Sequence, residues 1–167
     1  MTEQLVLDAG GPLGISGEPG RRVYTAAMPV RWSDQDLYHH VNHARMITLI
    51  EEARIPWLFE DGIPTATLAA GAVMTDLNVK YRGQVKHADG PIRVRMWCEK
   101  VGGALMIARH EVRGRHTPDS EPPAVDCTAR IAAFDLQTQR PRRSPVTRPA
   151  STSCFMWWLT VGWVSSR

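Results

Sequence analysis

Apolar and polar positions alternate over four stretches in the second half of this chain. The stretches are residues 77–81, 92–99, 104–112 and 124–136. A period of two predicts strands that bury one face and expose the other, as in an antiparallel sheet covered on one side. Gly102-Gly103, between two of these stretches, predicts a tight hairpin turn. Residues 23–32 also suit a strand, in which Pro29 indicates an edge or bulge position.

The spacing of apolar residues changes to three and four between this first strand and the others. Apolar residues on this spacing are Met46, Leu49, Ile50, Ala53 and Trp57. The pattern predicts a helix with one apolar stripe, for which Asn42 is a suitable N-cap. Pro56 lacks an amide hydrogen, so it should kink or end this helix. The order of one strand, one helix and four strands predicts an α+β domain with one long helix covering the sheet.

The length of 167 residues fits one domain, with a different composition at each end. Residues 1–21 contain Gly and Pro without periodicity and are expected to form a flexible leader. The domain itself is expected over residues 22–141. Residues 142–167 form an irregular Trp-rich tail, for which a partner-binding segment and an aberrant C-terminus are both open interpretations.

Composition and charge exclude several classes of protein. The formal charge of +3 is spread along the chain without a basic stripe interleaved with aromatic residues, so we expect no nucleic-acid partner. Three scattered cysteines without a CxxC pair predict neither a disulfide framework nor a zinc knuckle, and they suit the reducing cytoplasm. There is no signal-peptide pattern, and the apolar run 154–164 is too short for a membrane helix. The sequence therefore predicts a cytoplasmic protein without a membrane anchor.

The richest chemistry lies directly ahead of the predicted helix. Within ten residues the chain carries Asp34, Asp36, His39, His40, Asn42 and His43. A carboxylate beside the free amides of a helix start can activate a nucleophile while those amides bind a developing oxyanion. This pattern indicates acyl transfer. The three histidines lack a dedicated acidic third ligand, so we expect no metal site.

The segment RWSDQDLYHHVNHARMITLIEEAR, residues 31–54, resembles the signature of hotdog-fold acyl-CoA thioesterases of the 4-hydroxybenzoyl-CoA thioesterase type. The shared features are D-x-D, H-V-N and a helix ending in E-x-A-R. Later strands extend the resemblance to about residues 22–141. It implies a five-stranded antiparallel sheet wrapped around one long central helix. It also implies a homodimer or homotetramer with active sites at subunit interfaces, and hydrolysis of acyl-CoA to free acid and coenzyme A without a cofactor.

The resemblance assigns the catalytic carboxylate to Asp36 and the oxyanion donor to the backbone amide of His43. Asp34 is interpreted as structural. The chain departs from the family pattern at three positions, because His39 replaces a glycine, His43 an asparagine and Met46 a tyrosine. These departures bear on substrate preference more than on the fold or the reaction.

Four further residues are candidates for substrate binding. His40 is expected to orient the turn, and Asn42 to cap the helix first and contact substrate second. Glu51 is either an exposed helix carboxylate paired with Arg54 or a pocket residue. Arg82 lies on the polar strand face with Lys80, Arg93 and Arg95, where one or two of these cations could bind coenzyme A phosphates.

Three alternative functions remain open on the sequence. A thioesterase acting on acyl carrier protein would differ only in the acyl carrier and would need a basic surface near the pocket. A non-catalytic acyl-CoA-binding module would not require Asp36. A hotdog dehydratase would need a His and an acid that act on the β-carbon, which D-x-D with H-V-N does not provide.

Overall fold

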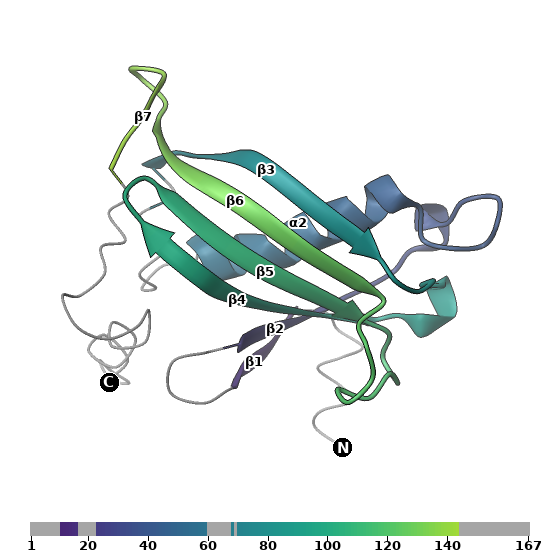
Figure 1. Ribbon diagram of the computed structural model, residues 1–167. Helices are drawn as coiled ribbons and strands as arrows, with labels where there is room; N and C mark the ends of the chain where they lie inside the picture. Colours follow the sequence, from purple (N-terminus) through teal and green to yellow (C-terminus); the bar gives the residue numbers. More distant parts are fainter. Residues whose placement is uncertain (1–10, 17–22, 60–67, 69, 144–167) are drawn as a thin grey trace, which may run out of the picture.

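The described part of the chain forms a curved antiparallel sheet with one long helix against its inner face (Figure 1). The computed structural model describes residues 11–16, 23–59, 68 and 70–143. Helix α2 comprises His43–Phe59. The strands are β1 (Gly11–Ser16), β2 (Val23–Met28), β3 (Ala72–Tyr81), β4 (Ile92–Gly102), β5 (Leu105–Arg113), β6 (Val125–Asp135) and β7 (Arg140–Pro141). Two short 3-10 helices, η1 (Trp32–Asp34) and η3 (His87–Asp89), lie in the connections.

The order of the strands is β1-β2-β4-β5-β6-β3, and β7 pairs with β6. Strands β2 to β6 with α2 form the hotdog arrangement that the sequence predicts, so this expectation is confirmed. Strand β1 lies within the expected leader, where residues 11–16 pair with β2 through a register shift between Pro12 and Gly14. Backbone pairing to a sheet edge does not require alternating side chains, which is why the sequence pattern missed this strand. Of the expected tail, residues 144–167 lie outside the described residues.

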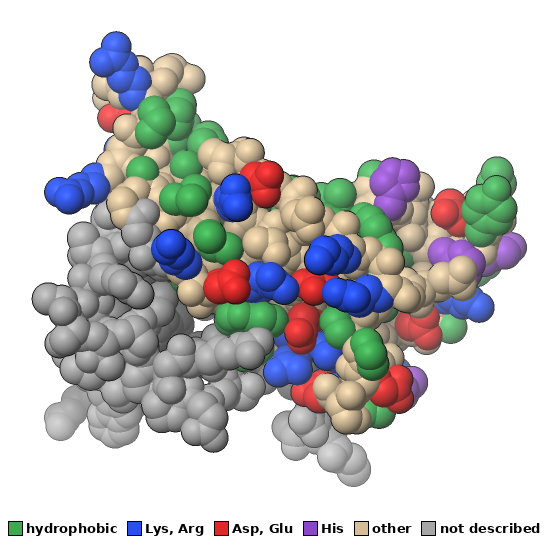
Figure 2. Space-filling view, viewed as in Figure 1, with side chains coloured by type: hydrophobic (Ala, Val, Ile, Leu, Met, Phe, Trp, Pro, Cys, Tyr) green, Lys and Arg blue, Asp and Glu red, His purple; other side chains and the backbone are tan. Residues whose placement is uncertain are grey.

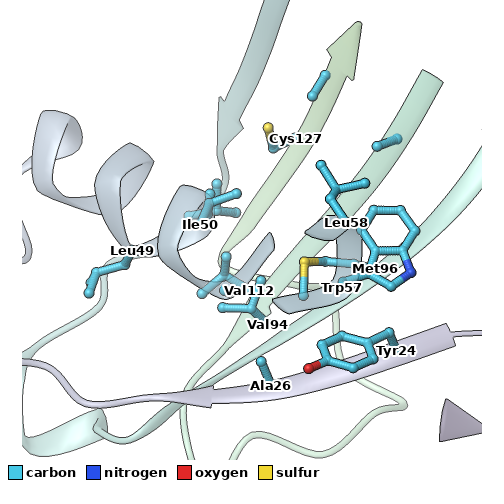
Figure 3. Packing of buried hydrophobic residues seen from close by; sticks show 14 of the residues in the cluster. Tyr24, Ala26, Leu49, Ile50, Trp57, Leu58, Val94, Met96, Val112 and Cys127 are labelled. Atoms are coloured by element: carbon cyan, nitrogen blue, oxygen red, sulfur yellow. The ribbon is translucent and has the colours of Figure 1, made fainter. Parts of the chain in front are cut away.

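Alternate residues of the central strands face the helix and form the core. Val94 and Met96 of β4, Val112 of β5 and Cys127 of β6 are fully or almost fully buried. Figure 3 shows these side chains together with Ile50 of α2 in the space between helix and sheet. The predicted turn between β4 and β5 is also present, with Gly103 in the left-handed region at φ +61°.

The helix follows its predicted stripe but not its predicted end. Met46, Leu49, Ile50, Ala53 and Trp57 are all buried. The helix continues through Pro56 to Phe59, so Pro56 does not end it, and the alternative that Pro56 kinks the helix stays a prediction. Pro56 has no amide hydrogen to donate to the Glu52 carbonyl. Because Glu52 is exposed, water can donate a hydrogen bond to that carbonyl instead.

Strand β3 occupies one edge of the sheet. It pairs with β6 along one side over ten residues, and no described strand lies along its other side. No helix in the described part of the chain is long and apolar enough to cross a membrane.

Candidate active site

The start of α2 is held by hydrogen bonds from three directions. The Asn42 side-chain oxygen accepts from the amide of Ala44 at 2.9 Å, which confirms Asn42 as the N-cap. The Asn42 amide donates to the Asp34 carbonyl at 2.8 Å. The buried Asp34 carboxylate accepts from the Arg31 amide at 2.7 Å, which confirms its structural role. The amide of Val41 reaches across to the Val85 carbonyl at 2.7 Å.

Asp36 lies in a closed turn just before this helix. One carboxylate oxygen, Oδ1, accepts from the amides of Tyr38 at 2.9 Å and His40 at 3.4 Å. The Asp36 amide donates to the His40 carbonyl at 2.9 Å, and the His39 amide to the Asp36 carbonyl at 3.0 Å. Within the described residues, the second oxygen, Oδ2, has no hydrogen-bond partner. The turn therefore orients the carboxyl group while leaving one oxygen available.

His39 allows the chain to reverse within this turn. Its φ of +60° lies in the left-handed region, which favours glycine because a Cβ is crowded there. The resemblance expects glycine at this position, and the backbone keeps the conformation that a glycine would supply. The His39 ring lies against Trp32, with ring centroids 6.2 Å apart.

The first residue of the helix, His43, presents its backbone amide beside this turn. Asn42 caps the amide of Ala44, whereas the His43 amide has no acceptor among the residues that the structure describes. The first amides of a helix point outward and carry partial positive charge, so they can bind an oxyanion. The His43 side chain is exposed, and only its backbone belongs to this arrangement.

Tyr81 joins the edge strand to the helix start, and the sequence analysis did not identify it. Its hydroxyl donates to the His43 carbonyl at 2.9 Å. Partial burial, together with the nearby Cys127 thiol, raises the pKa of Tyr81, so the hydroxyl remains protonated as a donor. Alternation alone placed Tyr81 on the inner side of a strand, but nothing in the sequence indicated which residue it would meet.

The structure brings together only some of the predicted site residues. Asp36, His40, Asn42 and the His43 amide lie around one helix start. Glu51 is exposed on α2 and forms no salt bridge within the described chain. Arg82 follows the end of β3, where its guanidinium lies 3.6 Å from Asp126 and is half exposed.

The other predicted cations lie on the outer sheet face, where acidic and basic side chains are interspersed (Figure 2). Arg93 and Arg95 both contact Asp119, at 3.0 and 3.3 Å, and Arg109 contacts Asp126 at 2.9 Å. These arginines are engaged by carboxylates on the face opposite the helix. Among the described residues, no three His, Cys, Asp or Glu side chains are grouped to hold a metal ion.

A small, partly open pocket lies between α2 and the β3–β6 side of the sheet. It is lined by Ile47, Ile50, Arg54, Leu77 and Cys127, and its cavity volume of about 10 Å³ leaves room for about one water molecule. Tyr81, Val79 and Leu77 face inward in succession along β3, and they connect the helix start with this pocket.

Comparisons with known proteins bear on the family and the fold of this chain. Residues 30–152 match the family profile described as the thioesterase-like superfamily. A thioesterase-annotated protein of Pseudomonas aeruginosa, PA2801, is 27% identical, with a TM-score of 0.62 over 72% of this chain and 91% of that one. An acyl-CoA thioesterase assigned in Xanthomonas campestris is 24% identical, with a TM-score of 0.58 over 72% and 97%. A Thermus thermophilus thioesterase, solved with coenzyme A and Zn, is 22% identical, with a TM-score of 0.60 over 73% and 85%. No curated protein sequence matches this chain significantly.

Proposed function

Because this chain belongs to the thioesterase-like superfamily, we propose that it hydrolyses acyl-CoA thioesters, with Asp36 as the catalytic carboxylate. The observation that carries the proposal is the pairing at the start of α2. A carboxylate with one unengaged oxygen lies in the turn that leads into a helix whose first amide, at His43, lacks an acceptor in the described chain. These are the two groups that attack on a thioester requires.

The proposed reaction begins with the thioester carbonyl oxygen directed at the His43 amide. Asp36 takes a proton from water, and the resulting hydroxide adds to the carbonyl carbon. Negative charge then develops on the carbonyl oxygen, where the helix-terminal amide stabilises it. Collapse of this intermediate breaks the C–S bond. The products are the free acid and the coenzyme A thiol, which receives the proton from Asp36.

The remaining predicted residues support this site in different ways. His40 closes the turn through its own backbone amide and carbonyl, and Asn42 holds the helix start. We assign Arg82 to a coenzyme A phosphate, because it is half exposed and follows directly after Tyr81. The coenzyme A bound to the Thermus protein supports this class of substrate. Glu51 is exposed on α2, and its predicted role in substrate binding stays a prediction.

We also propose that the protein acts as a homodimer or larger homo-oligomer. The support is the ten-residue strand β3, which pairs with β6 on one side and with no described strand on the other. Long edges of this kind are usually paired or covered. Met74 on this strand is 41% exposed, which is high for a large apolar side chain. Sedimentation equilibrium of the intact chain tests this point, and a monomer at micromolar concentration would contradict it.

We place the enzyme in a reducing compartment such as the cytoplasm. Cys127 is a buried thiol that forms no disulfide with any described residue, which fits such an environment.

The experiment that tests the function is thiol release from a panel of acyl-CoA thioesters by the wild type and Asp36→Asn. The asparagine oxygen can still accept from Tyr38 and His40, so the turn should persist while proton transfer is lost. We expect turnover to fall at least ~10²-fold, the lower range for loss of a catalytic acid or base. Asp119→Asn, on the outer face, is the matched control and should retain activity. Equal turnover by wild type and Asp36→Asn would overturn the assignment.

The same assay, extended to thioesters of acyl carrier protein, separates the alternatives. If the wild type hydrolysed only the acyl carrier protein thioesters, acyl carrier protein rather than coenzyme A would be the carrier of the substrate. Saturable binding of acyl-CoA without turnover by the wild type would favour the non-catalytic module instead.

A further inference from the structure

The three most exposed large apolar side chains in the described part of the chain lie around the turn that holds Asp36. Leu37 is 94% exposed and Tyr38 79% exposed, and they occupy the central positions of a β-turn. The His39 amide closes this turn by donating to the Asp36 carbonyl at 3.0 Å. Both side chains therefore project from the body of the protein, and the proposed reaction uses neither of them.

Trp32, which is 69% exposed, extends this apolar surface. Its ring lies 6.2 Å from the ring of His39 and 6.0 Å from that of His87, so it is next to the turn. Figure 2 shows hydrophobic and His side chains gathered at the end of the molecule at which α2 begins in Figure 1. We call Trp32, Leu37 and Tyr38 the apolar tip. Single exposed apolar residues are common, whereas a group of large ones marks an interaction surface.

The exposed charges around the apolar tip are all positive. In the surrounding residues 31–45 and 85–90, the exposed charged side chains are Arg31, Arg45 and Lys86. None of these three forms a salt bridge with a described residue, unlike the arginines of the outer sheet face. The nearby carboxylates are less exposed and accept hydrogen bonds from backbone amides, namely those of Asp34, Asp36 and Asp89. The tip therefore suits an apolar partner that carries negative charge on its surface.

Two other occupants fit this surface less well. A second copy that presented the same tip would bring the three unpaired cations together, because an isologous contact pairs a surface with itself. An acyl carrier protein holds its thioester at the end of a long pantetheine arm, away from its own surface. The apolar tip instead adjoins the proposed catalytic group directly, since the Tyr38 amide lies 2.9 Å from the Asp36 carboxylate. A partner at the tip must therefore present the thioester at its own surface.

A membrane that contains long-chain acyl-CoA meets this requirement. The acyl chain dissolves in the hydrocarbon and coenzyme A stays in water, so the thioester lies at the boundary between them. Trp and Tyr favour this boundary, because each combines an apolar ring with a polar group. Apolar groups of peripheral proteins enter the boundary by about 5–10 Å. Leu37 at that depth would place Asp36, its neighbour in the chain, level with the thioester.

We propose that the apolar tip, together with Arg31, Arg45 and Lys86, binds an anionic membrane surface from which the enzyme takes long-chain acyl-CoA. This inference rests on the proposed acyl-CoA hydrolysis and names how the substrate is presented. The basic side chains attract anionic headgroups, and a peripheral contact of this kind does not require a membrane-spanning helix. Asp36 and the His43 amide perform the chemistry, whereas the tip brings them to the substrate.

The first test is co-sedimentation of the full chain with sucrose-loaded vesicles. One set of vesicles is a mixture of phosphatidylcholine and phosphatidylglycerol, and the other is phosphatidylcholine alone. We expect the wild type to bind the mixed vesicles more tightly, and added salt should weaken this binding. Leu37→Ser should weaken binding at least about 5-fold, because transfer of a leucine side chain from water to an apolar phase is favourable by more than this factor. Leu37→Trp should bind like the wild type, because Trp also favours the boundary.

Matched variants test where the contact lies. Leu136→Ser changes another exposed leucine, in the turn after β6 at the opposite end of that strand from the tip, and should bind like the wild type. Lys86→Gln should reduce the preference for mixed vesicles about 5-fold, the effect of one basic residue close to an anionic surface. Lys100→Gln removes the same charge near the far end of β4 and should leave the preference unchanged.

Hydrolysis connects vesicle binding with the proposed function. The measured quantity is the rate on palmitoyl-CoA held in mixed vesicles, divided by the rate of the same protein on butyryl-CoA in solution. Leu37→Ser should lower this ratio in proportion to its loss of vesicle binding. Leu136→Ser should have the ratio of the wild type.

Absence of vesicle binding by the wild type would overturn the inference, as would equal binding by the wild type and Leu37→Ser. Dissociation of an oligomer by Leu37→Ser without vesicles would also overturn it, because the tip would then bind a second copy of the chain. So would a loss of activity by Leu37→Ser that is confined to acyl carrier protein thioesters, which would assign the tip to that carrier. Vesicle binding by a wild type that hydrolyses no acyl-CoA would instead overturn the proposed function.

Discussion

The hydroxyl of Tyr81 donates a hydrogen bond to the carbonyl oxygen of His43 at 2.9 Å and links the edge strand β3 to the first turn of α2. The His43 amide belongs to the same residue, so this contact helps to fix the group that we propose as the oxyanion donor. Tyr81 is a positioning residue, because it contacts His43 and not the reacting atoms.

Tyr81→Phe should therefore reduce kcat several-fold with little change in KM, because a small displacement of the donor weakens transition-state binding. The free energy of unfolding should fall by about 1 kcal/mol, as for one lost hydrogen bond. Steady-state kinetics and urea unfolding measure the two effects. A loss of stability with kcat unchanged would restrict Tyr81 to a structural role.

A second prediction concerns His39, in the turn that holds Asp36. Its φ of +60° costs about 1 kcal/mol in a residue with a Cβ. His39→Gly should remove this strain and raise the free energy of unfolding by up to about 1 kcal/mol, despite the greater flexibility of the unfolded glycine chain. His39→Ala retains the strain and loses the contact with Trp32, so it should be no more stable than the wild type. Thermal unfolding of the wild type and both variants measures these differences in stability. A His39→Ala variant that is more stable than the wild type would contradict the argument.

The fold was predictable from the sequence where burial imposes a regular spacing. Ile92, Val94 and Met96 must share the inner face of β4, and Met46 and Ile50 the inner side of α2. Few arrangements of a single helix and strands with one apolar face bury all of these side chains. Strand β1 could not be predicted in this way, because it is held by backbone pairing rather than by a patterned apolar face.

The candidate site was predictable only where its residues are neighbours in the chain. Asp36, Asn42 and His43 lie within eight positions, and capping and turn chemistry relate them directly. The contact between Tyr81 and His43 joins residues 38 positions apart and depends on where β3 lies in the sheet. The proximity of Arg54 to His110 similarly depends on how α2 and β5 are placed, and a histidine at an inward position of β5 does not indicate which residues surround it.

His110 leads to a prediction about stability at acidic pH. Burial is the main cause that lowers its pKa from 6.5 to about 3, with Arg54 and Arg109 adding to the effect. Between these pH values the unfolded chain binds a proton that the folded protein excludes. The stability associated with neutral His110 is therefore complete above pH 6.5 and is lost as the pH falls toward 3, by up to ~1.4 kcal/mol per pH unit.

His110→Leu should abolish this part of the acid sensitivity. Between pH 6 and pH 4.5, the free energy of unfolding of the wild type should fall about 2 kcal/mol more than that of the variant. Urea unfolding at both pH values measures the difference, and His116→Leu, at an exposed position after β5, serves as the control with the wild-type slope. The variant also removes two buried nitrogens without regular hydrogen bonds, so its free energy of unfolding near neutral pH need not fall below that of the wild type. Equal slopes for His110→Leu and wild type would mean that His110 gains its proton in the folded protein as readily as in the unfolded chain.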